Sequence, residues 1–199
     1  MVRAIMRGSL VSLVTLSPRA AVAQRVTRHP VAAVDSTSIR NRAAFLEFVR
    51  IQRQTLVEAA EAMPAVKYGF APRVGEFANV RTFGKQIRHL AATNYILAAA
   101  ALGQQPPADA GDEQGPDSVV TKEQHLAYLR GSYDALDRAA HAIGDESIPV
   151  LSSPISPFQG SAATRIALLS EAMIHAYDHY GQIVVYLRMN GIIPPASRP

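Results

Sequence analysis

The sequence predicts an all-α protein, a four-helix bundle with long loops between the second and third helices and between the third and fourth. Beyond about residue 36, apolar residues recur every three or four positions, and no segment shows the alternation typical of a strand. Prolines and glycines divide this region into four long helical segments. With 199 residues, 48% hydrophobic and 18% charged, the chain can form the core of one domain.

Residues 1–23 have the layout of a secretory signal peptide. Two arginines without an acidic residue precede a short apolar run, and the small residues Ala21 and Ala23 flank an expected cleavage site. The apolar run is too short to span a membrane. Arg19, close to the cleavage site, is more typical of an uncleaved cytoplasmic tail. We expect cleavage after Ala23, an extended leader over residues 24–35, and a periplasmic or secreted protein.

Composition limits the partners that the mature chain is expected to have. Cleavage would remove three of the 20 basic residues and none of the 16 acidic ones, which lowers the net charge from +4 to +1. No basic cluster interleaved with aromatic residues remains, so nucleic acid is not an expected partner. The sequence contains no cysteine, which excludes disulfides, cysteine-ligated zinc and a cysteine nucleophile.

The first two helices are predicted from apolar stripes and from the residues at their ends. The first is expected over residues 38–63, after the polar residues that begin at Asp35 and before Pro64. Its stripe consists of Ile39, Ala43, Leu46, Val49, Leu56, Ala60 and Met63. The second helix is expected over residues 76–102, with Gly103 after its last turn.

The third helix follows a stretch rich in proline, glycine and acidic residues, 104–120, which is predicted to be a long surface loop. Thr121 and Gln124 have the spacing of a capping box, which predicts the start of a helix that ends at Gly144. Its apolar stripe consists of Leu126, Leu129, Tyr133, Leu136, Ala140 and Ile143.

The fourth helix is expected over residues 161–190, after a second proline-containing loop at 145–160. Gly191 is placed to cap its C-terminus, and two prolines follow. The bundle as a whole is therefore predicted to occupy residues 36–195, as one domain without internal repeats.

Two of the six histidines, His175 and His179, lie four residues apart and therefore leave the same face of the fourth helix. Ala176 excludes the zinc-protease motif, which requires glutamate there. The spacing by itself also fits ordinary hydrogen-bonded histidines. The pair, however, shares a stripe with Leu168, Ala172, Ile183 and Tyr186. We therefore expect both side chains to point into the bundle, where a cation would remove the cost of burying them unpaired.

His89 is the expected third ligand, because it lies in the middle of a predicted helix with the apolar neighbours Ile87, Leu90 and Ile96. His125 and His141 are expected near the two ends of the third helix, where either could be exposed. His29 precedes a proline in the predicted leader.

Several segments resemble the DinB-like proteins, the DinB/YfiT superfamily of four-helix bundles. The strongest match is residues 175–195, from the histidine pair through Gly-Gln to the Gly-Ile-Ile-Pro-Pro sequence. Residues 83–95, around His89, resemble the second helix of that family. Residues 68–72 and 129–133 also fit. The resemblance covers about residues 36–195.

The resemblance implies a bundle that holds one divalent metal ion, zinc, nickel or iron, through one histidine of the second helix and two of the fourth. By motif position these are His89, His175 and His179. Many relatives have arginine where this chain has Tyr180, so one group often present near the site is missing. Characterised branches of the family resemble thiol-dependent transferases and isomerases.

Few other residues are candidates for a part in the chemistry. Gln182 could hydrogen bond near the metal, and Asp178 or Glu171 could serve as a base or orient a ligand, although Asp178 also fits a solvated face. Arg188 could bind substrate or cap its helix. Four tyrosines could line a pocket or belong to the core: Tyr95, Tyr133, Tyr177 and Tyr186.

The leading hypothesis is a secreted metal-binding bundle that acts on an unidentified small molecule as a metal-dependent hydrolase or a thiol-dependent transferase. Three neutral imidazoles would leave the ion an open position for water or substrate. One alternative is a non-catalytic module in which the metal is structural, and another is a helical interaction protein without metal. A homodimer is possible.

Overall fold

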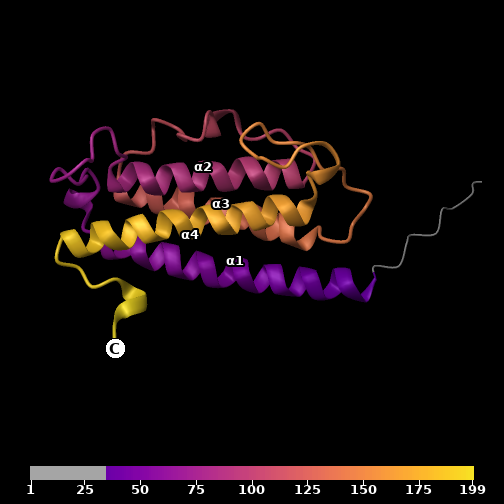
Figure 1. Cartoon of the computed structure of the whole chain (residues 1–199), viewed down its shortest axis with the longest axis horizontal. Helices are drawn as coiled ribbons and strands as arrows, with labels where there is room; N and C mark the ends of the chain where they lie inside the picture. The colour runs from indigo at the N-terminus through magenta and orange to yellow at the C-terminus, as the bar shows by residue number, and fades with distance from the viewer. Residues whose placement is uncertain (1–34) are drawn as a thin grey trace, which may run out of the picture. The chain divides into compact units, whose positions relative to one another are not determined.

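The computed structural model describes residues 35–199, and in this part of the chain there are four long α-helices and no strands. The helices are α1 (Ser36–Ala62), α2 (Phe83–Ala101), α3 (Lys122–His141) and α4 (Arg165–Met189), shown in Figure 1. The predicted four-helix bundle is confirmed. No helix of the described region is long and apolar enough to cross a membrane. The predicted signal peptide and the leader up to residue 34 lie outside the described residues.

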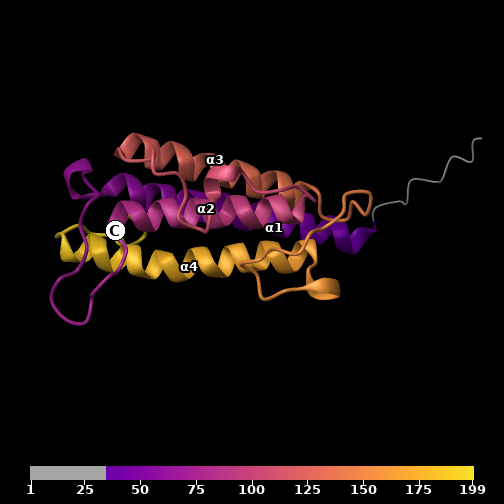
Figure 2. The same cartoon turned by 90° about the horizontal axis from the view of Figure 1, so that it is seen from above.

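Helices α2 and α3 run parallel, and α1 and α4 run in the opposite direction (Figures 1 and 2). The parallel pair is seen in two contacts: Gly84, near the start of α2, lies beside the side chain of His125, near the start of α3, and Asn94 Nδ2 contacts Ser132 Oγ at 3.2 Å about halfway along both helices. The connection at residues 102–121 must therefore return along the bundle, and Figure 1 shows it running beside α2. Long crossovers of this kind are a known variant of four-helix bundles.

The core lies between the helices, and the sequence stripes predict most of it. All six residues of the α3 stripe are buried, as are the four apolar residues that share a stripe with the α4 histidines. On α1 the prediction is wrong at the N-terminus: Ile39 is 55% exposed and Ala43 is also exposed. The reason is that α1 extends beyond the ends of the other helices there, so no other helix covers its first turns (Figure 1).

Two predicted helix starts are wrong. Helix α2 begins at Phe83, not at residue 76, with Thr82 as its N-cap. Asn79 has a φ of 64°, which is incompatible with a helix over residues 76–82, and Gly75 just before this range has a φ of 104°. Helix α4 begins after Thr164, not at residue 161, because residues 160–162 form a separate 3₁₀ turn.

Arg165, the first residue of α4, fixes one end of the bundle. Its buried guanidinium donates to the carbonyl oxygens of Ala101 and Ile148, both at 2.8 Å, and of Asp145 at 3.2 Å. It thereby satisfies a carbonyl at the C-terminus of α2 that has no partner within the helix. The same contacts hold the α3–α4 connection against the start of α4.

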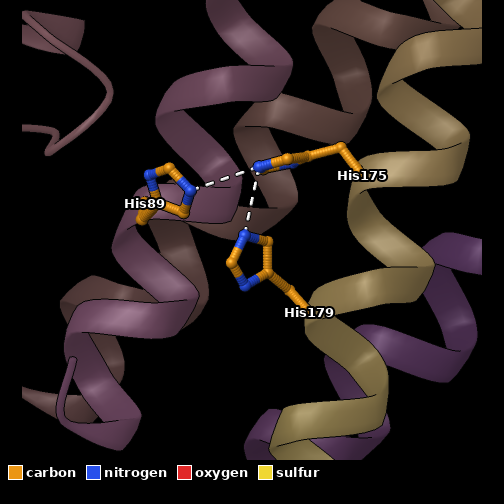
Figure 3. A group of neighbouring side chains, drawn as sticks. All are labelled: His89, His175 and His179. Atoms are coloured by element: carbon orange, nitrogen blue, oxygen red, sulfur yellow. Dashed lines mark hydrogen bonds between the residues drawn. The ribbon is translucent and has the colours of Figure 1, made fainter. Parts of the chain in front are cut away.

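Helices α2 and α4 are antiparallel neighbours. Arg165 contacts the end of α2, while the hydroxyl of Tyr186, near the end of α4, donates to the carbonyl oxygen of Arg81 at 3.0 Å. The middle parts of the two helices consequently face each other. His89 lies there on α2, opposite His175 and His179 on α4 (Figure 3).

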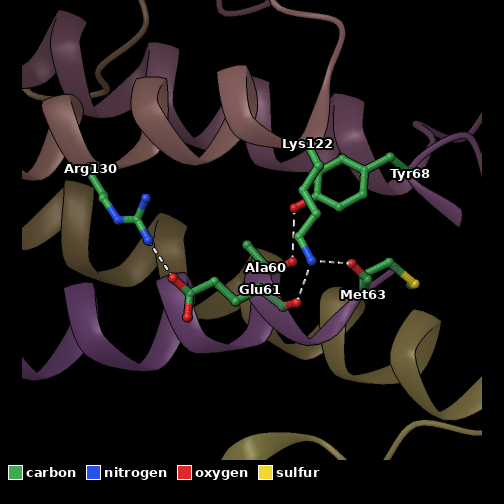
Figure 4. Close-up of polar contacts among 6 residues, drawn as sticks. All are labelled: Ala60, Glu61, Met63, Tyr68, Lys122 and Arg130. Carbon is green, nitrogen blue, oxygen red and sulfur yellow. Dashed lines mark hydrogen bonds and ion pairs between the residues drawn. The ribbon is translucent and has the colours of Figure 1, made fainter. Parts of the chain in front are cut away.

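The C-terminus of α1 is held by side chains from outside the helix (Figure 4). The ammonium of Lys122 donates to the carbonyl oxygens of Glu61 at 2.6 Å and Met63 at 2.9 Å, and Tyr68 Oη donates to that of Ala60 at 2.8 Å. A cation at a helix C-terminus also interacts favourably with the helix dipole. Lys122 begins α3, so this contact fixes α1 against the antiparallel α3.

We predict that Lys122→Met lowers the free energy of unfolding by about 1–2 kcal/mol, because hydrogen bonds to a charged donor are lost from two carbonyls. Urea titration followed by circular dichroism measures the effect. Lys67→Met, at an exposed position, is the control. Equal stability of the two variants would contradict a role for the Lys122 ammonium.

Candidate metal centre

Three imidazoles from two helices converge between α2 and α4 (Figure 3). His175 Nε2 lies 3.2 Å from His89 Nε2 and 3.1 Å from His179 Nε2. The three residues form a group whose ligand atoms all lie within 4.8 Å of one another. His89 and His179 are buried and His175 is half-buried. The structure thus brings together the three histidines that were selected from the sequence.

The α2–α3 connection determines which nitrogen of His89 carries its hydrogen. His89 Nδ1 lies 2.7 Å from the carbonyl oxygen of Glu113. A carbonyl can only accept, so Nδ1 must donate, and a neutral His89 therefore presents the lone pair of Nε2 to the other two rings. Glu113 has a φ of 70°, unusual for a residue with a side chain.

The environment keeps all three histidines neutral. Burial, together with charge on neighbouring histidines of the cluster, lowers the pKa of His175 to about 3 and that of His179 to about 4. Burial also lowers the pKa of His89, although its hydrogen bond to the carbonyl of Glu113 acts in the opposite direction. Neutral imidazole is the form that binds metal ions.

Hydrogen bonds among the rings cannot satisfy the cluster. His89 Nε2 carries no hydrogen, so a hydrogen on His175 Nε2 is needed for any bond between those two atoms. If only one of the three Nε2 atoms carries a hydrogen, it can bond to the lone pair of one neighbour, and the lone pair of the third ring stays unpaired. The Nδ1 atoms of His175 and His179 are buried and have no partner in the described part of the chain. One cation would accept all three Nε2 lone pairs together.

The spacing of the nitrogens fits a metal ion. Nitrogens held about 2.0–2.1 Å from a tetrahedral zinc ion lie roughly 3.3–3.4 Å from one another. The two measured Nε2–Nε2 distances, 3.2 and 3.1 Å, are within a few tenths of an ångström of that separation. The three residues could therefore hold an ion with small side-chain adjustments.

Comparison with known proteins agrees with this geometry. A family model described as the DinB superfamily matches residues 49–183, which include all three histidines and more than half of the chain. The chain belongs to the DinB superfamily. No curated protein and no solved structure matches it.

In this DinB-superfamily protein, His125 and His141, the two other histidines that the structure describes, do not join the cluster. His125 was considered a possible exposed helix-end residue, but it is 5% exposed. Its Nδ1 contacts the carbonyl oxygen of Thr121 at 2.7 Å, and its ring packs against Tyr68. His141 lies at the exposed end of α3, within 3.3 Å of the Asp137 carboxylate. His29 lies outside the described residues.

The polar residues proposed as helpers have varied surroundings. Gln182 accepts a hydrogen bond from Gln86 Nε2 at 2.7 Å and donates one to Asp178 at 3.2 Å. Asp178 is exposed, in agreement with the alternative prediction that it lies on the solvated face of its helix. Glu171 accepts from the Ser156 hydroxyl at 2.5 Å, and burial raises the pKa of its carboxyl.

Arg188 and the four tyrosines occupy mainly structural positions in the DinB-superfamily fold. Arg188 donates to Ser197 at 3.2 Å. Tyr133 is fully buried and Tyr186 is bound to the carbonyl of Arg81, while Tyr177 is exposed. Tyr95 packs its ring against that of Tyr128.

Sequence reasoning missed two residues of this DinB-superfamily protein that act on the cluster. Glu113 contributes through its backbone carbonyl, for which its position in a polar loop gives no signal. Arg81 adds positive charge that helps to lower the pKa of each of the three histidines, after the larger effect of burial. It was assigned to the interior of a helix that in fact begins at Phe83.

We predict that the metal-free protein loses stability between pH 7 and pH 5. The folded-state pKa values of His175 and His179 lie below the unfolded value of about 6.5, so the unfolded chain binds protons more readily in this range. Their contribution to stability is present above pH 6.5 and decreases as the pH falls toward 4.

Urea midpoints at several pH values measure this dependence. The double variant His175→Gln/His179→Gln should show a weaker pH dependence between pH 7 and pH 5, and the control His141→Gln should match the parent. Carboxylates, including Glu171 with its raised pKa, are the same in all three proteins, so their contribution cancels in the comparison. Identical slopes in all three proteins would contradict the assignment.

Proposed function

We propose that this DinB-superfamily protein binds one divalent metal ion through the Nε2 atoms of His89, His175 and His179, and acts on a small molecule as a metal-dependent hydrolase or thiol-dependent transferase. The observation that carries the proposal is the convergence of three neutral Nε2 atoms from two helices at separations of 3.2 and 3.1 Å. Zinc, nickel and iron are the expected ions, since imidazole is a suitable ligand for each.

Each residue of the site has a distinct part in this proposal. His175 and His179 supply two lone pairs from adjacent turns of one rigid helix, and His89 supplies the third from α2. The carbonyl oxygen of Glu113 accepts a hydrogen bond from His89 Nδ1 and so orients that ring. A bound divalent ion would supply Lewis-acid activation of water or of a substrate thiol in its remaining coordination position.

A working site is favoured over a structural one by a polar cavity close to the histidines. Gln86 and Gln182, which line a cavity of about 430 Å³, are three residues from His89 and His179 on the same helices. A cavity next to the histidines offers a place for a substrate, which a purely structural ion would not need. We further propose that the protein is exported, with cleavage after Ala23, and that it can form a homodimer.

Elemental analysis of protein purified without an affinity tag tests metal binding. We expect about one equivalent of a divalent metal in the parent and little in His175→Ala and His179→Ala, because two ligands cannot hold the ion as tightly as three. His141→Ala, outside the cluster, should retain the metal. Equal metal content in all four proteins would overturn the proposal.

The same samples distinguish a working ion from a structural one. If the ion only stabilises the fold, its removal lowers the melting temperature but no added ligand enters its coordination shell. If the site is active, a small thiol alters the absorption spectrum of cobalt-substituted protein, because the thiolate binds the metal directly.

Glu113 offers a test of the backbone contact to His89. Glu113→Gly tolerates a φ of 70° and should leave metal affinity nearly unchanged, whereas Glu113→Pro requires a φ near −65° and displaces the carbonyl. We expect Glu113→Pro to weaken metal binding about 10- to 100-fold, as measured by competition with a chelator. Equal affinities of the proline and glycine variants would show that the carbonyl does not orient the ring.

A further inference from the structure

A polar cavity of about 430 Å³ lies at the N-terminal end of α2 and carries positive charge. Its lining residues are Asn79, Val80, Arg81, Lys85, Gln86, Gln114 and Gln182. They come from three segments that are distant in sequence: the residues before and within α2, the α2–α3 connection, and α4. The lining includes two cations and no acidic residue.

The cavity adjoins the histidine cluster. Gln86 precedes His89 by three residues on α2, and Gln182 follows His179 by three residues on α4, so each glutamine shares a helix face with a histidine. Three residues of α-helix rise by about 4.5 Å. The hydrogen bond between the two glutamines, at 2.7 Å, connects the facing helices between the cluster and the cavity.

Two polar atoms at the cavity are buried without a partner. Arg81 Nε has no hydrogen-bond acceptor within residues 35–199, and no ion pair of its guanidinium occurs there. Gln86 is 2% exposed, and its Oε1 likewise lacks a donor in the described region. Buried polar groups are nearly always hydrogen-bonded in folded proteins, so the unpaired Arg81 donor beside a cavity indicates an acceptor ligand, whereas Gln86 Oε1, itself an acceptor, would need a donor such as water.

The backbone of Arg81 is fixed although its side chain is unpaired. The hydroxyl of Tyr186 donates to the carbonyl oxygen of Arg81 at 3.0 Å, and Thr82 immediately afterwards caps α2. The guanidinium is near enough to the cluster for its charge to act on all three histidines, in addition to the larger effect of their burial. A cation held at this place can bind one end of a molecule whose other end reaches the histidines.

We propose that this cavity is the substrate subsite of the metal centre and binds a carboxylate group, with Arg81 as its main ligand and Lys85 adding positive charge. The edge of a guanidinium presents parallel N–H donors that match the two oxygens of a carboxylate. The substrates are thus small carboxylic acids with a metal-binding group a few bonds from the carboxylate. This inference rests on the proposed metal site.

Two thiols that differ in charge test the subsite on cobalt-loaded protein. 3-Mercaptopropionate carries a carboxylate, and 3-mercaptopropionamide is its neutral counterpart of the same shape. Binding of either thiolate to cobalt is followed through the new absorption band. We expect the carboxylate to bind the parent protein about tenfold more tightly than the amide, because it gains charge-assisted hydrogen bonds to Arg81.

Arg81→Gln should abolish this preference, and both thiols are compared on the same fully cobalt-loaded variant so that any change in cobalt affinity cancels. Arg73→Gln is the matched control, because Arg73 is an exposed arginine in the same connection and does not line the cavity. It should retain the full preference. The variants are compared at the same pH and ionic strength, since screening affects a charged contact.

The outcomes separate the subsite from the metal site. The subsite alone would be overturned if the parent protein gives a cobalt spectrum but binds the two thiols with equal affinity. It would also be overturned if the preference for the carboxylate persists in Arg81→Gln. Loss of the preference in Arg73→Gln as well would show a general effect of charge and also overturn it. Absence of a cobalt spectrum in the parent would overturn the metal site and, with it, the subsite.

Discussion

Three imidazoles must share one buried space between α2 and α4, and much of the surrounding structure serves to keep them there uncharged. A positive charge on one ring would be repelled by a charge on either neighbour and would be poorly solvated. The cluster is therefore compatible with the fold only while its rings are neutral. That condition leaves three nitrogen lone pairs in proximity, an arrangement that a divalent cation satisfies better than any hydrogen-bond pattern among the rings.

The direction of the helices contributes as much as their composition. Because α2 and α3 are parallel, the chain between them has to return along the bundle, and it passes beside α2 on the way (Figure 1). The carbonyl of Glu113 reaches His89 from this returning segment. A short turn between antiparallel helices would supply no such group. Topology thus provides one of the contacts that orient the imidazole of His89.

The sequence predicted the helices and the three histidines because both depend on local periodicity. His175 and His179 share a face by spacing alone, and the apolar neighbours of His89 indicated its burial. It could not predict the start of α2, where Gly75 and Asn79 adopt positive φ angles. It also gave no sign of Glu113, whose role belongs to its backbone, or of the burial of His125, which depends on packing against Tyr68. Those features arise from contacts between distant segments.

The division of the histidines between two helices has a consequence for the order of assembly. The pair on α4 is preorganised as soon as that helix forms, while the third nitrogen arrives only when α4 docks against α2. In the proposed site, all three nitrogens would hold an ion only after this docking. Since α4 is the last of the four helices to be synthesised, full coordination of such an ion would follow translation of the whole bundle.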